Sequence, residues 1–400
     1  MQLSGAHRAG ILRFGFCGDF HAALLFVGVH SLALLEIENK DYLTTQLITY
    51  IGNKRALLEE IDSAVNGIKQ KLGRQKCVCA DLFSGSGVVS RSFKRHSSLL
   101  ISNDLEEYAE MLNSCYLSNQ KDFDRQLWLE TKEKIEKLAA ETQIEGIIAR
   151  NYAPKDSRCI KPGERAFYTR ENALRIDTFR YYIDKAPEEM RKFFLAPLLT
   201  EASVHVNTSG VFKGFYKDKN TGIGCFGAAG KDALSRILGA IELKMPVLSN
   251  YECAYEIYRQ DAVELASQLK AVDIAYLDPP YNQHPYGSNY FMLNLILKNK
   301  IDTEISKVSG ITQDWNRSDF NKAKTALASM EAIVSRIDSK FLVISYNSEG
   351  FISFEEMTGM LKKYGKLETR EILYNTFRGS RNLRSRPIHV SEYLFILEKD

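Results

Sequence analysis

The chain has 400 residues, of which 44% are hydrophobic and 26% charged, a composition that is typical of globular proteins and excludes disordered and fibrous ones. Its net charge of +3 excludes a uniformly basic surface, although a local basic patch remains compatible with it. The length suits two domains better than one.

Residues 1–40 differ from the rest of the chain. The segment 22–35 is apolar apart from His30 and Ser31, and it is shorter than the roughly 20 residues that a membrane span needs. Asp19 interrupts the flank and no small-residue cleavage site follows, which disfavours a secretory signal. We therefore expect a disordered leader or a start site assigned too far upstream, and no membrane association.

A short basic turn follows at Tyr50-Ile51-Gly52-Asn53-Lys54-Arg55. Gly-Asn favours a turn, and the lysine and arginine side chains can bind a carboxylate or a phosphate. Short basic turns are common on protein surfaces, so this segment alone does not indicate a function.

A glycine-rich turn follows the first expected strand. Residues 77–83 form a short apolar run that predicts a buried strand, and Asp81 and Phe83 lie at its end, before Gly85 and Gly87. Glycine permits positive φ angles and a close approach of a ligand to the backbone. Ser90 stands where a dinucleotide-binding fingerprint has its third glycine, which favours a smaller nucleoside ligand over a pyrophosphate.

Two acidic residues follow two further expected strands. Asp104 comes after the strand 99–102, and Asp261-Ala262 comes after the strand 255–258. Either aspartate can cap the helix that begins there. In the alternative, Asp104 binds the ribose hydroxyls of a nucleoside and Asp261 accepts a hydrogen bond from a cofactor adenine. The glycine turn favours ribose binding for Asp104.

Residues 117–249 are too long for an ordinary connection, and their composition shifts. Within 150–180, arginines that include Arg165 and Arg170 alternate with aromatic residues, a pattern that suits contacts with phosphates or guanine edges. Some of these arginines are instead expected on solvated helix faces beside acidic residues. A second basic segment begins at Lys213, and a third contains Arg378 and Arg381.

The most informative segment is Asp278-Pro279-Pro280-Tyr281, which follows the apolar strand 274–277. The prolines lack N–H groups and stiffen the chain, so the segment presents hydrogen-bond acceptors beside a flat ring. This set suits a flat ligand with an amino group, such as a nucleobase. Further strands are expected at 341–346 and 392–397, and the alternation with helices predicts a mainly parallel sheet with helices on both faces.

These motifs, in this order, resemble those of the Dam-like, alpha-class adenine-specific DNA methyltransferases. The resemblance covers roughly residues 41–400 and implies an α/β, Rossmann-like methyltransferase sheet with an inserted target-recognition domain. The catalytic domain would comprise 41–116 and 250–400, and the DNA-binding insert 117–249. The leading Asp278 resembles the adenine enzymes, whereas serine in its place would resemble enzymes that methylate the cytosine amino group.

The resemblance also implies S-adenosylmethionine as the methyl donor and assigns residues to it. The cofactor-binding residues would be Tyr50, Gly52, Asn53, Lys54, Asp81, Phe83, Gly85, Gly87, Asp104, Asp261 and Ala262. The target base would be held by Asp278, Pro279, Pro280 and Tyr281. We further predict DNA contacts from Arg165, Arg170, Lys213, Tyr286, Asn289, Arg378 and Arg381.

The predicted activity is methylation of the adenine amino group in duplex DNA, by base flipping and direct displacement. Two alternatives are also compatible with the sequence: an RNA adenine methyltransferase, and a catalytically idle DNA-binding relative. We expect a monomer in the cytoplasm of a bacterial or archaeal cell, with a cognate restriction endonuclease in the same system. The seven cysteines form no Cys-x-x-Cys pair, so no metal site is predicted.

Overall fold

The computed structural model describes residues 37–227, 233–375 and 389–400, and Glu38–Asp400 form one compact unit. Most of the predicted leader lies outside these residues, as do Arg378 and Arg381. Within the described ranges, no helix combines the length and apolar character that crossing a membrane requires.

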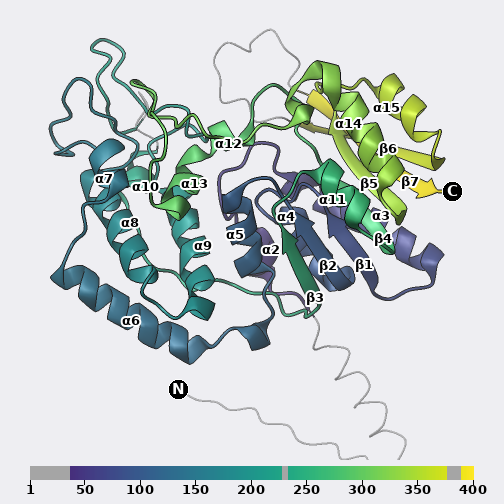
Figure 1. The fold of residues 1–400 in the computed structure, drawn as a ribbon, viewed down its shortest axis with the longest axis horizontal. Helices are drawn as coiled ribbons and strands as arrows, with labels where there is room; N and C mark the ends of the chain where they lie inside the picture. The colour runs from purple at the N-terminus through teal and green to yellow at the C-terminus, as the bar shows by residue number, and fades with distance from the viewer. Residues whose placement is uncertain (1–36, 228–232, 376–388) are drawn as a thin grey trace, which may run out of the picture. The chain divides into compact units, whose positions relative to one another are not determined.

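A seven-stranded sheet forms the centre of the unit, in the order β3-β2-β1-β4-β5-β7-β6 (Figure 1). The strands are β1 (Cys77–Asp81), β2 (Ser97–Asn103), β3 (Ala254–Tyr258), β4 (Val272–Leu277), β5 (Ser339–Asn347), β6 (Gly365–Asn375) and β7 (His389–Lys399). The first five are parallel, and β7 is antiparallel to both β5 and β6. The predicted Rossmann-like α/β fold, with a mainly parallel sheet, is confirmed.

Fourteen α-helices accompany the sheet in the described part of the chain. They are α2 (Lys40–Thr44), α3 (Leu58–Leu72), α4 (Val88–Phe93), α5 (Glu107–Tyr116), α6 (Arg125–Glu141), α7 (Ile147–Asn151), α8 (Arg170–Ile183), α9 (Glu188–Val204), α10 (Leu234–Leu238), α11 (Ala262–Gln268), α12 (Tyr286–Asn289), α13 (Phe291–Lys298), α14 (Ala323–Arg336) and α15 (Phe354–Leu361). Short 3₁₀ helices form at η1 (Lys54–Leu57), η2 (Lys94–His96), η3 (Gln120–Asp122) and η4 (Asp319–Asn321).

Helices cover both faces of the sheet because its strand residues alternate between two apolar cores. On one face, Cys77 and Cys79 of β1 pack with α3 and α4. On the other face, Ala80 packs with α11, α14 and α15. Each strand therefore has apolar side chains on both faces, as is typical of parallel sheets that helices cover on both sides.

A third core belongs to the helices α6, α8 and α9, which pack together with α5 and α13. Trp128 of α6 stacks on Phe194 of α9 with ring centroids 5.1 Å apart, and both side chains are buried. Helices α6 to α10 fall within the predicted insert, but α5 and α13 lie outside it. The boundaries 117–249 therefore stay a prediction.

The edge strand β6 was not predicted from the sequence. Its residues include Lys366, Glu368, Arg370 and Glu371, so it lacks the apolar run that marked the other strands. An edge strand has only one neighbour, and charged side chains there protect it from pairing with other chains.

The topology brings several chain segments to one edge of the sheet. Since β1 to β4 are parallel, their carboxyl ends lie side by side. The chain moves outward from β1 to β2 and β3, and from β4 to β5 on the other side. Ligands of open α/β sheets bind at the point where the strand order reverses, which here lies between β1 and β4.

Candidate active site

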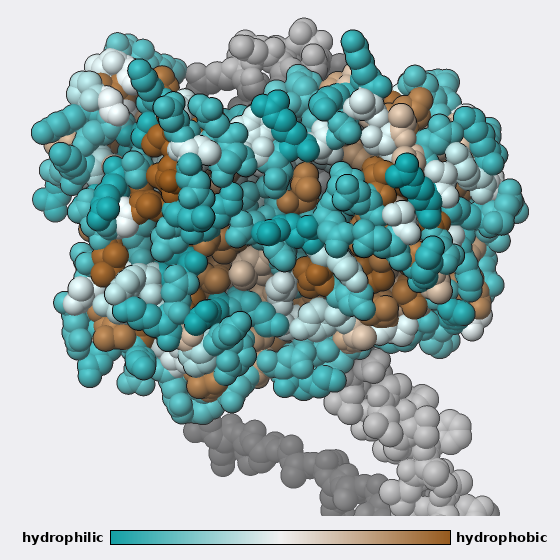
Figure 2. Space-filling model, viewed as in Figure 1, coloured by the Kyte–Doolittle hydropathy of each residue, from teal (hydrophilic) through white to brown (hydrophobic). Residues whose placement is uncertain are grey.

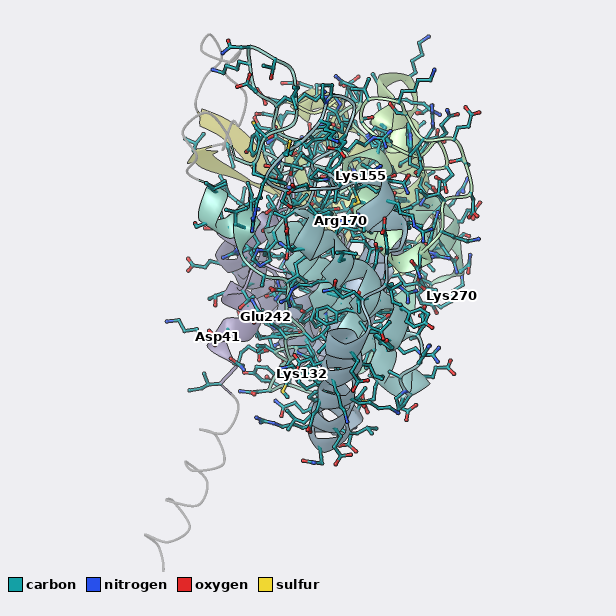
Figure 3. The ribbon with its side chains drawn as sticks, turned by 90° about the vertical axis from the view of Figure 1, so that its left-hand side faces the viewer. Asp41, Lys132, Lys155, Arg170, Glu242 and Lys270 are labelled. Carbon is teal, nitrogen blue, oxygen red and sulfur yellow. The ribbon has the colours of Figure 1, made fainter. Side chains whose placement is uncertain are left out.

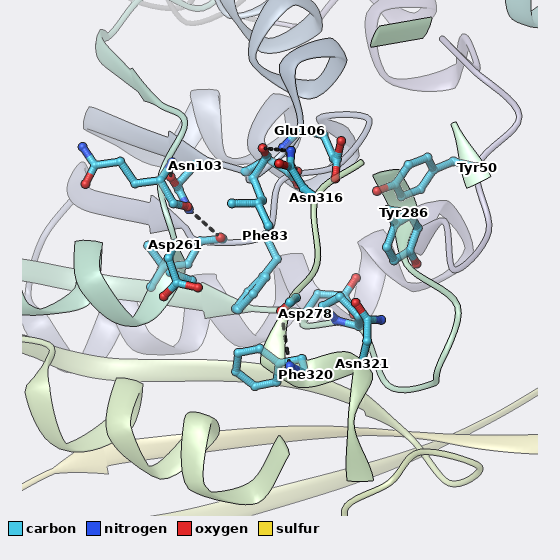
Figure 4. A pocket seen from close by; sticks show the side chains of 17 residues that line it. Tyr50, Phe83, Asn103, Glu106, Asp261, Asp278, Tyr286, Asn316, Phe320 and Asn321 are labelled. Atoms are coloured by element: carbon cyan, nitrogen blue, oxygen red, sulfur yellow. Dashed lines mark hydrogen bonds between the residues drawn. The ribbon is translucent and has the colours of Figure 1, made fainter. Parts of the chain in front are cut away.

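A pocket opens at this carboxyl edge, between the ends of β1 to β4 (Figure 4). Its walls are formed by Tyr50, Leu82, Phe83, Asn103, Asp104, Leu105, Glu106, Gln260, Asp261, Ala262, Asp278, Pro280, Tyr286, Asn316, Ser318, Phe320 and Asn321. The pocket thus brings Phe83, Asp104, Asp261 and Ala262, which were predicted to bind the cofactor, together with Asp278 and Pro280 of the predicted base-binding segment. The other predicted residues that follow β1, namely Gly85 and Gly87, do not line it, and neither do Asp81, Pro279 and Tyr281.

The glycine turn is shaped by the side chains that lie against it. Gly85 has a φ of +52°, and a Cβ atom there would lie 2.7 Å from the Tyr50 hydroxyl. Gly87 has a φ of +77°, and its Cβ would lie 2.5 Å from Oδ1 of Asn113. Both positions therefore require glycine, for backbone conformation and for space. The basic turn and the glycine turn, separate in sequence, meet through Tyr50.

Asp104 ties the end of β2 to the glycine turn. Its Oδ2 accepts a hydrogen bond from the Gly85 N–H at 2.8 Å, and its Oδ1 accepts one from the Glu106 N–H at 2.9 Å. Each carboxylate oxygen has a second lone pair, so a ribose hydroxyl remains a possible further partner. Burial raises the pKa of Asp104.

Asp261 caps helix α11, as one of the two sequence-based alternatives stated. Its Oδ1 accepts hydrogen bonds from the N–H groups of Val263 at 2.8 Å and Glu264 at 3.3 Å. The same residue and Ala262 also line the pocket. A cap and a ligand contact are compatible, because a carboxylate has acceptor sites on both oxygens.

Tyrosine rings form the wall between the basic turn and α12. The Tyr50 ring stacks on Tyr286 and on Tyr290, with centroid distances of 5.0 Å to each. The Tyr286 hydroxyl donates to the Ile51 carbonyl at 3.0 Å, and the Tyr290 hydroxyl accepts from the Ile51 N–H at 2.8 Å. Tyr286, predicted to contact DNA, thus lies on the pocket wall. Gly52 passes close to the hydroxyls of Tyr281 and Tyr286 at a φ of +75°.

Asn53 and Lys54, in the second half of the basic turn, have different roles. The Asn53 side chain caps η1 by accepting a hydrogen bond from the Arg55 N–H at 2.8 Å. Lys54 is buried, and its Nζ lies 3.1 Å from Oδ1 of Asp278 and 2.6 Å from Oε1 of Glu392. The lysine of the basic turn therefore contacts the acid of the Asp-Pro-Pro-Tyr segment directly.

Buried acids dominate the electrostatics of the pocket. Burial raises the pKa of Asp278 to about 7, with Lys54 opposing the shift and Glu392 adding to it. Burial also raises the pKa values of Asp81 and Glu106 to about 7. Burial acts to lower the pKa of Lys54, but Asp278 and Glu392 outweigh it and raise that pKa. Ionised acids in such a pocket favour a cationic ligand.

Several pocket residues were not identified from the sequence. Glu106 is buried and accepts a hydrogen bond from Asn294 at 2.7 Å. Asn316 donates to the Leu105 carbonyl at 2.9 Å, and Phe320 packs edge-on against Phe83 at 5.3 Å. Asn316 and Phe320 lie between helices α13 and α14, in a segment that includes η4 and does not directly follow a strand. No pattern in the sequence therefore indicated them. Glu392, the partner of Lys54, does not line the pocket. The sequence did offer a sign of its importance, because it is an acid at the start of an apolar run that predicts a strand.

The arginines predicted to contact DNA have partners within the protein. Arg165 donates to the carbonyls of Asn151, Ser306 and Lys307 at 2.9–3.1 Å. Arg170 donates to the Ala149 carbonyl at 2.9 Å and pairs with Glu145 at 2.8 Å. Their DNA contacts stay a prediction, and each arginine has a structural role besides.

The other two predicted DNA contacts within the described ranges differ in exposure. Asn289 is buried, and its carbonyl accepts from the Phe212 N–H at 2.8 Å. Lys213, next in the chain to Phe212, is partly exposed.

The surface is chemically mixed. The face seen in Figure 2 is mostly hydrophilic, with apolar side chains scattered singly and in small groups. In the side view, Lys155 and Arg170 lie toward one end of the helical region, and Lys132 lies toward the other (Figure 3).

Comparison with known proteins gives a family match over most of the chain. Residues 50–360 match the model of the D12 class N6 adenine-specific DNA methyltransferases. The type II methyltransferase M.NlaIII of Neisseria lactamica is 28% identical over 361 residues, which cover 88% of this chain and 99% of that protein. The type II methyltransferase M.CviAII of Paramecium bursaria Chlorella virus 1 is 31% identical over 363 residues, which cover 88% and 98%.

Solved structures resemble the chain only distantly. The magnesium protoporphyrin IX methyltransferase of Synechocystis PCC 6803 is 9% identical, with a TM-score of 0.30 over 90% of this chain and 88% of that one. A similarity this low carries no argument, so the fold assignment depends on the sheet itself.

Proposed function

Because the chain belongs to the D12 class N6 adenine-specific DNA methyltransferase family, we propose that it uses this pocket to methylate the exocyclic amino group of adenine in duplex DNA. The observation that carries the proposal is the position of Asp278. It directly follows β4 and lines the pocket that Asp104 and Asp261 also line. A cofactor site and a site for the target amino group are therefore contiguous.

We propose S-adenosylmethionine as the cofactor, because the residues of the pocket fit it. The φ angle and the close packing of Gly85 leave room for backbone approach but not for a side chain. Phe83 and Phe320 offer apolar surface, and the pocket is lined by the carboxyl groups of Asp104, Glu106, Asp261 and Asp278, which suit a sulfonium cation when ionised. When bound, S-adenosylmethionine supplies an electrophilic methyl group.

The proposed cofactor contacts divide among three parts of the ligand. Asp104 would hold the ribose, and Asp261 with Ala262 would hold the adenine. The methionine part would be surrounded by Tyr50, Lys54, Asp81, Phe83, Gly85 and Gly87. Gly52 and Asn53 would belong to the same cofactor site, without an assigned part of the ligand.

Asp278 and the Pro279 carbonyl would accept hydrogen bonds from the target amino group. The lone pair of that nitrogen is delocalised into the adenine ring, which makes it a poor nucleophile. Two fixed acceptors favour a more tetrahedral nitrogen whose lone pair points at the methyl group. Alignment and fixed dipoles would supply most of the catalysis, and the proton is lost to solvent after transfer.

A base within a duplex cannot reach this pocket, so we propose that the target adenine flips out. Unstacking the base costs a few kcal/mol, whereas stacking on an aromatic ring such as Tyr281 stabilises the flipped base by about 1–3 kcal/mol. Contacts with phosphates must therefore help to stabilise the extruded base. Candidates for these phosphate contacts are Arg165, Arg170, Lys213, Arg378 and Arg381, and Tyr286 and Asn289 are proposed as further DNA contacts.

The biological setting forms part of the same proposal. Two type II methyltransferases are among the relatives, and we propose that this chain serves as the modification enzyme of a restriction–modification system, with a cognate endonuclease in the same cell. It would act as a monomer in the cytoplasm of a bacterial or archaeal cell.

Methyl transfer from labelled S-adenosylmethionine to duplex DNA and to structured RNA tests the proposal. Wild-type protein should label DNA, and Asp278→Ala should keep the fold and cofactor affinity but lose transfer. Tyr281→Ala should weaken capture of the base more than cofactor affinity. Label that enters only RNA would contradict the proposed substrate, and full activity of Asp278→Ala would contradict the assigned site.

A further inference from the structure

A buried ion cluster of three residues lies beneath the Asp-Pro-Pro-Tyr segment. The Lys54 ammonium is 3.1 Å from Oδ1 of Asp278 and 2.6 Å from Oε1 of Glu392. Lys54 is 4% exposed and Glu392 is 1% exposed. Glu392 is the closer partner, although only Asp278 lines the pocket.

Neighbouring side chains hold Glu392 in a fixed orientation. The Ser345 hydroxyl donates to its Oε1 at 2.6 Å, and the Asn347 side-chain amide donates to its Oε2 at 3.2 Å. Both donors belong to β5, which pairs with β7 so that Asn347 lies opposite Glu392. The Glu392 carboxylate is thus held by two side chains of a neighbouring strand rather than by a loop.

A second buried carboxylate is not needed to neutralise Lys54, because Asp278 alone can pair with it. Burying an additional charge carries a desolvation cost that an ion pair does not always offset. Glu392 changes two things at the site. It fixes the position of the ammonium, and it shares the positive charge, so that Asp278 is less fully neutralised and remains a strong acceptor.

We propose that Glu392 is a positioning residue for methyl transfer, which anchors Lys54 so that its ammonium holds the Asp278 carboxylate in place for the target amino group. This inference rests on the proposed function, because it assigns Asp278 to the adenine amino group. Glu392 itself acts through Lys54 and touches neither substrate nor cofactor.

The first test compares Glu392→Gln with Glu398→Gln. Both residues are on β7, but Glu398 pairs with Lys71 at the surface, 3.3 Å away. Glu392→Gln should lower the single-turnover transfer rate on the order of 10- to 100-fold, the loss that a small misalignment causes. Lys54 keeps its charge and its partner Asp278 in Glu392→Gln, so the Kd for S-adenosylmethionine should stay within about twofold. Glu398→Gln should match wild type in both rate and Kd.

The second test is a double-mutant cycle with Lys54→Met. Lys54→Met alone should be slow, because it leaves two buried carboxylates without their cation. If Glu392 acts through Lys54, adding Glu392→Gln should cause no further loss of rate and should raise the melting temperature. Losses that multiply in the double variant would indicate an independent structural role and overturn the proposal.

Ser345→Ala provides a variant that keeps all three charges, and it carries the test if Glu392→Gln fails to fold. It removes the hydroxyl that orients Glu392, so it should lower the transfer rate severalfold without changing cofactor affinity. A wild-type rate in both Ser345→Ala and a folded Glu392→Gln would overturn this inference but leave the proposed function intact. Inactive wild-type protein would instead overturn the proposed function.

Discussion

The Lys54 ammonium lies 3.1 Å from Oδ1 of Asp278, although one residue precedes the first strand and the other follows the fourth. The contact joins the basic turn to the Asp-Pro-Pro-Tyr segment inside a buried site. Burial nevertheless raises the pKa of the Asp278 carboxyl group to about 7, although Lys54 opposes this shift. The protonation state of Asp278 should therefore change within the range of ordinary assays.

We predict that methyl transfer falls as the pH drops through about 7, because protonated Asp278 loses acceptor capacity for the target amino group. Single-turnover rates between pH 5.5 and 8.5, with saturating cofactor and DNA, would measure the dependence. Asp278→Asn is the control, since an amide oxygen accepts a hydrogen bond but does not titrate. It should be slower than wild type and nearly independent of pH. A dependence that persists in Asp278→Asn would point instead to Asp81 or Glu106, whose pKa values are also about 7.

Asp81 leads to a prediction about stability. Its pKa is raised to about 7 by burial, above the unfolded value of 3.8. Stability from the protonated form is present below about pH 4 and is lost as the pH rises through about 7. Asp81→Asn keeps the acceptor for the Ser90 hydroxyl, 2.6 Å away, without the charge. The free energy of unfolding of Asp81→Asn relative to wild type should rise by at most about 3 kcal/mol between pH 5 and pH 8, and its melting temperature relative to wild type should rise accordingly. A difference that is flat with pH would contradict this assignment.

Gly85→Ala should weaken S-adenosylmethionine binding by at least about tenfold. The new Cβ would meet the Tyr50 hydroxyl at 2.7 Å, and the φ of +52° would strain any other residue by roughly 1–2 kcal/mol. Calorimetric titration of the cofactor measures the effect. Gly67→Ala in α3 is the matched control, because nothing lies within 4 Å of its Cβ position. It should bind the cofactor normally and be more stable by about 0.5–1 kcal/mol. Normal cofactor affinity in Gly85→Ala would remove the glycine turn from the proposed site.

Lys213→Ala should weaken DNA binding without affecting stability, whereas Arg165→Ala should lower stability. Lys213→Ala should keep its melting temperature, weaken DNA binding on all sequences and reduce the salt slope of affinity by about 1. Arg165→Ala should lower the melting temperature, because Arg165 bonds the carbonyls of Asn151, Ser306 and Lys307. Melting curves and binding at several salt concentrations decide the matter. An unchanged salt slope in Lys213→Ala would exclude that residue from the interface.

Much of the fold could be predicted from the sequence because its strands are buried on both faces. Runs such as 274–277 and 341–344 are continuously apolar, and the acids and glycines that follow several of the strands mark the edge where ligands bind. Strand β6 could not be found this way, because its charged residues follow from its edge position and its pairing with β7.

The site could be predicted only where its residues follow strands. Asp104, Asp261 and Asp278 do so, and all three line one pocket. Asn316 and Phe320 reach the same pocket from a loop, and only the folded chain places them there. The contact between Lys54 and Glu392 joins the two ends of the described chain, and no spacing in the sequence indicates such a contact.

The most direct test of the central claim is nucleoside mass spectrometry of duplex DNA after incubation with the protein and S-adenosylmethionine. The account predicts N6-methyladenine with wild-type protein and none with Asp278→Ala of equal cofactor affinity. Methylated cytosine, or unmodified DNA with active methylation of RNA, would contradict it.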